Sequence, residues 1–251
     1  MIVYKSDAEI ERMRIAGRIV AETIERVTAA VAGGRSTADL DRVAESFIAE
    51  RGATPSFKGY KGFPATICAS INNEIVHGIP SKDRVLRPGD LLSLDFGAIW
   101  EGFHADAAVT VFVETSPSPE AEKLVEATRE SLEAGISAIR PGGRLTDIGE
   151  AIQQVAEGAG FSLVREYGGH GIGRALHEDP FVPNFGPPGR GPELKPGLVL
   201  AVEPMANLGD SPTRLLADDW TVVTADGSLS AHFEHTIAVT AEGHEILTLS
   251  S

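Results

Sequence analysis

Apolar and polar side chains alternate most clearly over residues 91–113, and this pattern predicts a hairpin of two antiparallel strands. Segments 91–99 and 103–113 are rich in apolar, aromatic and β-branched residues, and a short turn sequence that includes Gly102 separates them. Because side chains alternate between the two faces of a strand, one face of this hairpin carries only apolar side chains. We expect that face to pack against the core, with the residues Leu92, Leu94, Phe96, Phe103, Ala105, Ala107 and Val109.

The opposite face of the predicted hairpin carries two carboxylates. If Trp100 and Glu101 form a two-residue loop, Asp95 lies directly opposite Asp106. Like charges at facing positions destabilise a sheet, and aspartate is uncommon inside strands. Either the pair is solvated or shares a proton on an exposed face, or it binds a divalent cation. The hairpin alone leaves both interpretations open.

Helical periodicity occurs in two regions, and each time strand-like segments follow it. Ser6 and Glu9 have the spacing of a capping box, and Ser36-Thr37 can cap a second helix. The expected helices span about 6–31, 36–52, 116–139 and 146–158, and the expected strands about 65–71, 91–113, 161–166, 198–203, 220–223 and 231–239. No linker divides the chain, so we predict one α+β domain over 1–251 with two similarly built halves, about 6–113 and 116–240.

Composition narrows the class of protein. The chain has 251 residues, of which 42% are hydrophobic and 23% charged, as in an ordinary globular protein. Its formal net charge of −14 argues against a nucleic-acid or anionic membrane partner. Cys68 is the single cysteine, which excludes an intramolecular disulfide and a thiolate zinc site. There is no apolar run of membrane-spanning length and no signal-peptide pattern, so we expect a cytoplasmic protein.

Five further positions outside the hairpin could carry chemistry. His77 lies beside glycine and proline, and His170 and His177 lie in a glycine-rich stretch. Glu203 ends an apolar strand, and Glu234 lies within another. Each has an ordinary alternative, because such histidines are commonly turn or surface residues and a buried glutamate can pair with Arg or Lys.

Taken together with the hairpin aspartates, these positions supply a plausible set of metal ligands. Two aspartates, one histidine and two glutamates are all oxygen or imidazole donors, which suits Mn, Fe, Co or Zn. Four carboxylates and two divalent cations would balance in charge, whereas one cation would leave the site anionic. The candidates for such a set are Asp95, Asp106, Glu203 and Glu234 together with one of the three histidines.

The same residues stand in motifs that resemble those of type I methionine aminopeptidases, which belong to metallopeptidase family M24. The motifs are Asp95 with Asp106, Gly169-His170-Gly171-Ile172-Gly173 with His177-Glu178, Val202-Glu203-Pro204-Met205, and Phe233-Glu234-His235-Thr236. Their order and spacing are specific, and the resemblance extends over nearly the whole chain. It implies the pita-bread fold, a curved antiparallel sheet with helices on the outer face and two pseudo-symmetric halves.

The resemblance also implies an activity and residue roles. The family removes the N-terminal methionine from nascent proteins and peptides with a small second residue, using water activated by two metal ions. Five positions match the family's metal ligands, and Asp106 and Glu234 match those that bridge both metals. The five predicted ligands are Asp95, Asp106, His170, Glu203 and Glu234. From the chemistry of such a site, we expect Glu203 to act also as the general base. His77 and His177 match the two catalytic histidines, which also contact the substrate.

Further positions match the family's substrate pocket and a possible cation site. The walls of the methionine pocket are implied to be Tyr60, Phe63, Cys68, Leu176 and Trp220. Three positions depart from the residues most frequent in the family, namely Phe57, Phe63 and Leu176. A monovalent cation is implied near the backbone of Asn72, Glu74 and Ser230.

Partners and rival functions complete the prediction. We expect the N-termini of nascent polypeptides as partners, with the ribosome as one place of encounter, and a monomeric protein. An aminopeptidase P or prolidase would use the same ligands on X-Pro substrates, but those enzymes usually carry a separate N-terminal domain. A binding protein that has lost its metals is the other alternative, and the presence of all five ligand types argues against it.

Overall fold

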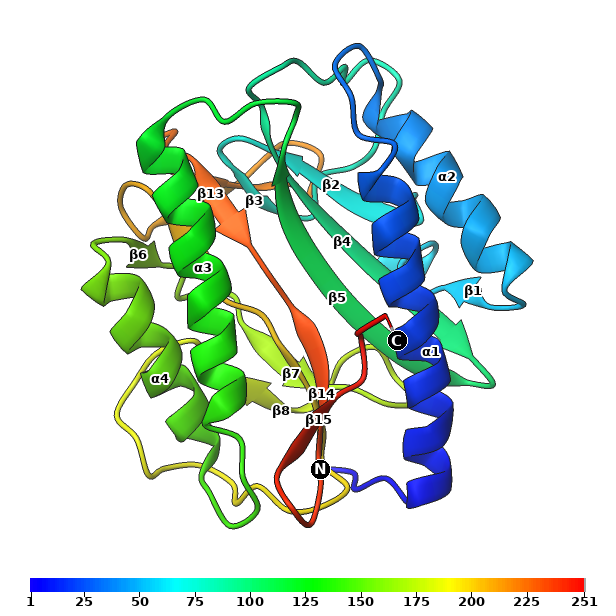
Figure 1. Ribbon diagram of the computed structural model, residues 1–251, viewed down its shortest axis with the longest axis vertical. Coiled ribbons are helices and arrows are strands. Elements are labelled where there is room, and N and C mark those ends of the chain that lie inside the picture. Colours follow the sequence, from blue (N-terminus) through cyan, green and yellow to red (C-terminus); the bar gives the residue numbers. More distant parts are fainter. Residues whose placement is uncertain (251) are drawn as a thin grey trace.

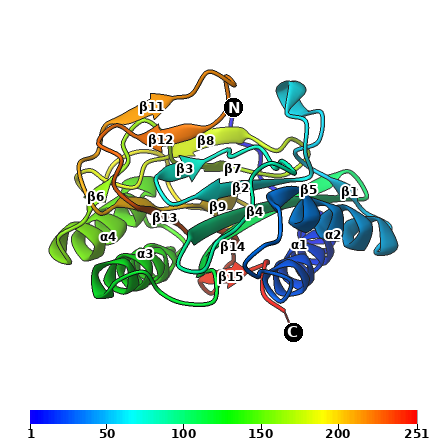
Figure 2. The ribbon, with the colours of Figure 1, turned by 90° about the horizontal axis from the view of Figure 1, so that it is seen from above.

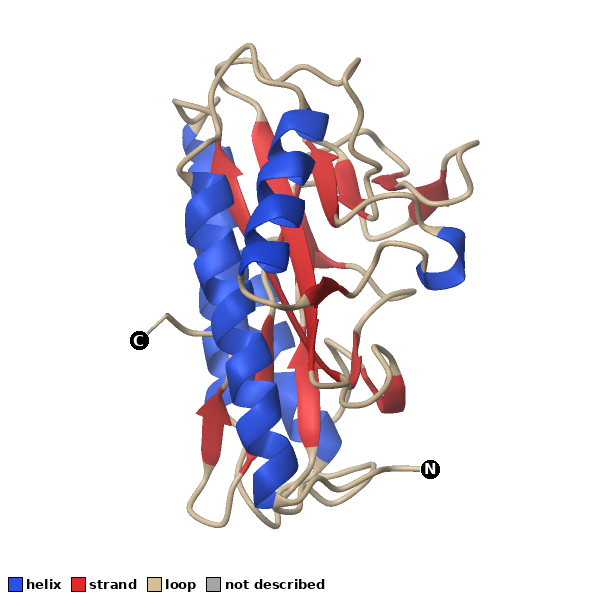
Figure 3. Cartoon of the chain, turned by 90° about the vertical axis from the view of Figure 1, so that its right-hand side faces the viewer, coloured by secondary structure: helices blue, strands red, loops and turns tan. Residues whose placement is uncertain are grey.

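Four α-helices cover one side of a curved layer of antiparallel strands, and loops with shorter strands lie on the other side (Figures 1 and 3). The computed structural model describes residues 1–250. The helices are α1 (Asp7–Thr28), α2 (Thr37–Glu50), α3 (Pro119–Ser137) and α4 (Leu145–Gly158), with a short 3₁₀ turn η1 (Tyr60–Gly62). Among these helices, none has the length and apolar composition needed to cross a bilayer.

The predicted helix starts are confirmed, because the caps form as the sequence indicates. Ser6 and Glu9 form the capping box of α1, and the Ser36 hydroxyl accepts a hydrogen bond from the Asp39 N–H at the start of α2. Ser118 caps α3, whose first residue is a proline. The first three helices end two or three residues earlier than the apolar periodicity suggests, as expected for fraying final turns, and α4 ends at Gly158 as predicted.

The strands form four small antiparallel sheets, and most of them lie above the helices in Figure 2. The first half contributes β1 (Thr54–Pro55), β2 (Ile67–Ile71), β3 (Glu74–Val76), β4 (Leu91–Trp100) and β5 (Phe103–Phe112). The second half contributes β6 (Ser162–Leu163), β7 (Gly169–Gly171), β8 (Glu178–Val182), β9 (Val199–Val202), β10 (Met205–Asn207), β11 (Thr213–Leu215), β12 (Val222–Thr224), β13 (Ser230–His232), β14 (His235–Val239) and β15 (His244–Ile246).

The central hairpin β4–β5 forms as predicted, but its register differs by two residues. Asp95 pairs with Ala108 and Gly97 pairs with Asp106, so the two aspartates are diagonal neighbours on one face. The turn residues are Glu101 and Gly102, both with positive φ, which matches the turn type that suits a twisted hairpin. Glycine adopts a positive φ readily. The predicted loop, Trp100 and Glu101, contains no glycine, which explains why the turn forms one residue later.

The predicted strand over 231–239 is interrupted, and this correction matters for the site. β13 pairs with β10 and β14 pairs with β9 in one common register, with His232 opposite Met205 and His235 opposite Val202. In the gap between the two ladders, Glu203 therefore lies opposite Glu234. Pro204 provides no N–H for a ladder hydrogen bond there, and Glu234 pairs instead with Ala108 of β5.

Two core clusters lie between the strands and the helices. The first packs α1 and α2 against the apolar face of β4 and β5, including Leu92, Leu94 and Phe96. The second packs α3 and α4 against β9 and β14, including Leu200 and Ile237. The helix side of the strand layer is thus filled with apolar side chains, which leaves the opposite face for the polar residues.

Candidate active site

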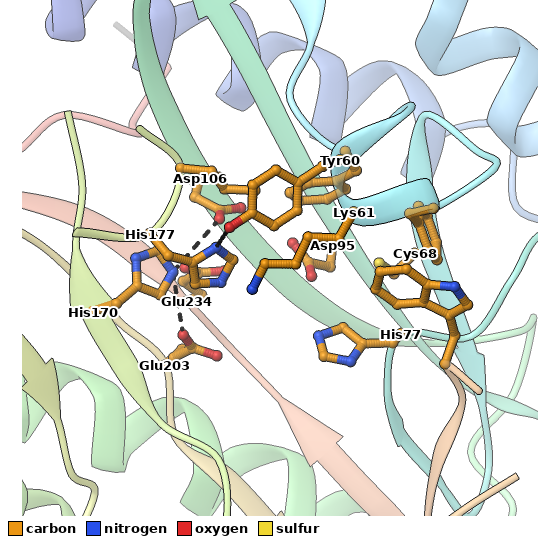
Figure 4. Close-up of a pocket in the computed structure, with 14 residues that line it drawn as sticks. Tyr60, Lys61, Cys68, His77, Asp95, Asp106, His170, His177, Glu203 and Glu234 are labelled. Atoms are coloured by element: carbon orange, nitrogen blue, oxygen red, sulfur yellow. Dashed lines mark hydrogen bonds and ion pairs between the residues drawn. The ribbon is translucent and has the colours of Figure 1, made fainter. Parts of the chain in front are cut away.

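The five predicted ligands come together because they lie in two adjacent rows that run across the paired strands. Asp95, Glu234 and Glu203 lie side by side, since Asp95 pairs with Ala108, Ala108 bridges to Glu234, and Glu234 faces Glu203. Asp106 and His170 lie two residues further along their strands, His170 opposite Ala201. Alternation along the strands therefore directs all five side chains to the face away from the helices, where they line one pocket (Figure 4).

The tightest group in the pocket has the geometry of a metal site. Asp106, His170 and Glu234 are buried, and each offers a ligand atom that lies within 4.8 Å of the other two. The His170 Nε2 lies 3.6 Å from Glu203 Oε1 and 4.0 Å from Asp106 Oδ2. The Nδ1–H of His170 can donate to the Gly171 carbonyl at 2.9 Å, and this tautomer leaves the Nε2 lone pair directed at the carboxylates.

The carboxylates of this cluster lack the partners that buried charges need. One oxygen each of Asp95, Asp106 and Glu234 is buried without a hydrogen-bond partner in the described structure. Burial raises the pKa of Asp95 to about 7. Burial and neighbouring carboxylates raise the pKa values of Asp106, Glu203 and Glu234 well above their usual range. Unpaired oxygens converging with an imidazole fit divalent metal ions, which would supply the missing positive charge.

The two predicted catalytic histidines lie on different sides of the cluster (Figure 4). The exposed His177 stacks against Tyr60, its Nδ1 lies 3.0 Å from the Tyr60 hydroxyl, and its ring centroid lies 4.2 Å from that of His170. His77 follows β3, has a positive φ, and packs edge-on against Trp220 and Tyr167. Loss of hydration where the His177 ring faces the pocket, together with the neighbouring His170 and Lys61, lowers the pKa of His177 to about 3. Burial lowers the pKa of His77 to about 4, so both imidazoles are neutral near pH 7.

The residues predicted to hold the methionine side chain line the same pocket, which has a cavity volume of about 160 Å³. Phe63 and Trp220 form an edge-to-face pair with ring centroids 5.0 Å apart. The departing residue Phe57 also lines the cavity. The predicted wall residues in this pocket are Tyr60, Phe63, Cys68, Leu176 and Trp220.

Two residues of the site were not predicted from the sequence, one in the pocket and one beside the carboxylate cluster. Lys61 lines it, so the pocket is not free of charged side chains. His232 is buried, and its Nε2 lies 3.7 Å from Glu203 Oε2. Lys61 stands in the aromatic, glycine-rich loop next to Tyr60, and His232 stands two residues before Glu234. The period-two pattern of a strand could have placed His232 on the ligand face.

The backbone segments implied for a monovalent cation are neighbours. The Ser230 N–H donates to the Asn72 carbonyl at 3.0 Å, and Asn72 has a positive φ. The Glu74 carboxylate accepts from the Ile71 N–H and pairs with Arg84. Cation binding there stays a prediction.

Comparison with known proteins gives a consistent result. The family model for metallopeptidase family M24 matches residues 11–241. A methionine aminopeptidase of Clostridium acetobutylicum is 55% identical over 249 residues, which cover 99% of this chain and 99% of that protein. The crystal structure of a methionine aminopeptidase from Thermotoga maritima has a TM-score of 0.98 and 44% identity, and the match covers 100% of both chains.

More distant structures share the fold alone. The prolidase of Pyrococcus horikoshii has a TM-score of 0.79 at 21% identity, and the match covers 100% of this chain but 65% of the prolidase. The predicted pita-bread fold is therefore confirmed.

Proposed function

The chain belongs to metallopeptidase family M24, and from this premise we propose that it removes the N-terminal methionine from polypeptides with a small second residue. The observation that carries the proposal is the cluster of four carboxylates and one imidazole with unpaired buried oxygens, beside a cavity of side-chain size whose walls are mostly aromatic and aliphatic. A metal-dependent hydrolase needs this combination of ligands and a specificity pocket.

The chemistry divides between the metals and the residues around them. Two divalent ions held by the five predicted ligands would lower the pKa of a water molecule at the first peptide bond and polarise its carbonyl. In this proposal the Glu203 carboxylate, whose Oε1 lies 3.6 Å from His170 Nε2, accepts the proton of that water as the general base. We propose Co, Mn, Fe or Zn as the metal, on the basis of the oxygen and imidazole donors.

The histidines act on the substrate directly in this proposal. If the Tyr60 hydroxyl donates to the His177 Nδ1, the proton of the neutral ring is on Nε2, which can donate to the developing oxyanion. His77 lies on the other side of the cavity and is available to contact the scissile amide or the second residue. The aromatic and aliphatic wall favours a flexible thioether over a charged side chain.

The proposed substrates are the N-termini of nascent polypeptides, met by a monomer and in part at the ribosome. The decisive experiment combines metal analysis with turnover of two peptides, Met-Ala-Ser and an X-Pro peptide of equal length. We expect about two metal ions per chain and cleavage of the Met-Ala bond alone. Preferential cleavage of the X-Pro bond would identify a prolidase-like enzyme, and a chain with neither metal nor turnover would be a binding protein.

A further inference from the structure

One buried side chain reaches the carboxylate cluster although neither the sequence prediction nor the comparisons assign it a role. His232 ends β13 with 2% of its surface exposed, and its Nε2 is buried with no hydrogen-bond partner in the described structure. Buried polar groups normally have partners, so an unpaired imidazole nitrogen facing a carboxylate requires an explanation. The nearest anionic atom is Glu203 Oε2, at 3.7 Å.

The Glu203 carboxylate stands between two imidazoles. His170 Nε2 lies 3.6 Å from Oε1, and His232 Nε2 lies 3.7 Å from Oε2. The symmetry follows from the strand register, because His170 is opposite Ala201 and His232 is opposite Met205, each two residues from Glu203. The His170 Nδ1 has the Gly171 carbonyl as an acceptor, whereas Nε2 of His232 has no competing partner and is free to carry its proton.

The surroundings hold both residues in place. The Thr110 hydroxyl accepts from the His232 N–H at 2.9 Å and donates to the His232 carbonyl at 2.7 Å. The Asn184 side-chain amide donates to the Glu203 carbonyl at 3.0 Å. These hydrogen bonds fix the backbones of His232 and Glu203. The imidazole and the carboxylate therefore face each other because of the strand register, and no flexible loop is involved.

We propose that His232 is a positioning residue that donates its Nε2–H to Oε2 of Glu203 and so keeps Oε1 directed at the metal cluster. The proposal rests on the proposed function, because Glu203 is there both a ligand and the general base. A fixed donor at one oxygen favours a single orientation of the carboxylate, in which the other oxygen faces the metal site, while the remaining lone pairs stay available to accept a proton. Partners of this kind orient metal ligands, and their loss typically costs about 10–100-fold in metal affinity or activity.

The test uses three substitutions at one position. His232→Leu removes the donor at similar volume, His232→Gln restores an N–H at similar reach, and His232→Asn is polar but too short. Calorimetric titration of chelator-stripped protein with Co²⁺ and steady-state kinetics on Met-Ala-Ser give two independent readouts. We expect the Leu and Asn variants to bind Co²⁺ about 10–100-fold more weakly and to lose kcat more than KM. The Gln variant should stay within a few-fold of the wild type.

A matched control separates positioning from general damage. His235 lies on the opposite face of the same chain segment and pairs with Thr248 through Nδ1 at 2.8 Å, so His235→Leu should lower thermal stability without a selective loss of Co²⁺ affinity. Wild-type Co²⁺ affinity in His232→Leu and His232→Asn, or equal impairment of His232→Gln, would overturn the inference. Failure of the wild-type protein to bind Co²⁺ would instead overturn the proposed function.

Discussion

Glu203 and Glu234 lie opposite each other where the pairing between two neighbouring strands is interrupted. Elsewhere in that ladder the backbones are bound to each other, but here Glu234 pairs with Ala108 of the first half. Two carboxylates at facing positions would weaken an ordinary sheet. Their facing positions are consistent with a cation bound between the two carboxylates. The pairing of Glu234 with Ala108 also brings a strand of the first half to the same point.

Removing a carboxylate that faces both metals should abolish turnover. In Asp106→Asn and Glu234→Gln the charge is lost while the shape is kept, so we expect metal content to fall together with activity. Elemental analysis and a Met-Ala-Ser assay measure the two effects. Glu242→Gln, at an exposed site, is the control. Near wild-type turnover in either test variant would contradict the dinuclear assignment.

His177→Ala should lower kcat far more than it raises KM. The side chain is exposed and its recorded polar contact is with Tyr60, so the fold should not depend on it. Loss of one oxyanion donor typically costs about 10²–10³ in kcat. Tyr60→Phe should give a smaller loss of the same kind, since only the orienting hydroxyl is removed. An unchanged kcat in His177→Ala would show that His177 is an ordinary surface residue with no catalytic role.

Leu176→Ala should relax selectivity for the first residue of the substrate. The side chain is 3% exposed and lines the cavity, so its truncation enlarges the slot for bulkier apolar residues. Shape discrimination of this kind is usually worth about 1–3 kcal/mol. Relative kcat/KM on a panel of first and second residues tests this, with Leu215→Ala at an exposed site as the control. If selectivity for the first residue were unaltered, Leu176 would not form part of the wall of the methionine pocket.

Metal binding should release protons, and more of them at lower pH. Burial raises the pKa of Asp95 to about 7, so part of its population is protonated at pH 6.5 and must ionise to bind a metal ion. Titrations with Co²⁺ in buffers of different ionisation enthalpy report the number of protons released. We expect a larger number at pH 6.5 than at pH 8. A pH-independent release of zero would contradict the protonated cluster.

His235 should make the protein sensitive to acid. Burial lowers its pKa from 6.5 to about 4, so between these values the unfolded chain binds a proton that the folded chain does not. Stability therefore falls as the pH drops from 6.5 to about 4. His235→Gln should flatten the free energy of unfolding against pH by at most about 1.4 kcal/mol per unit. Chemical denaturation at several pH values measures it, and parallel curves would refute the assignment.

Local signals in the sequence were sufficient for the helices and for the face of each site residue. The capping residues Ser6 and Ser36 start their helices as predicted, because a cap is read from neighbouring residues. The apolar face of the central hairpin was also correct, since a register change of two residues leaves every side chain on its face. The error in the turn came from choosing Trp100 over Gly102 as a loop residue.

The pairing of strands that are far apart in the sequence could not be predicted from the local pattern of apolar and polar residues. Nothing within residues 231–239 shows that Glu234 leaves one ladder to pair with Ala108, because that depends on a strand more than a hundred residues away. The resemblance gave the pocket residues, but the presence of Lys61 in the same cavity depends on how one loop folds over it. His232 lies outside the family motif, and only the alternation of side chains along its strand indicates that it shares a face with Glu234.

The bridge between Ala108 and Glu234 joins the first and the second half of the chain, and the five predicted ligands divide between these halves. Asp95 and Asp106 come before the connection at residue 115, and His170, Glu203 and Glu234 come after it. Neither part alone can hold the cluster. Turnover therefore reports the integrity of the entire molecule. A screen for inhibitors that measured only the loss of activity would also select compounds that weaken the interface between the two halves without binding at the substrate pocket.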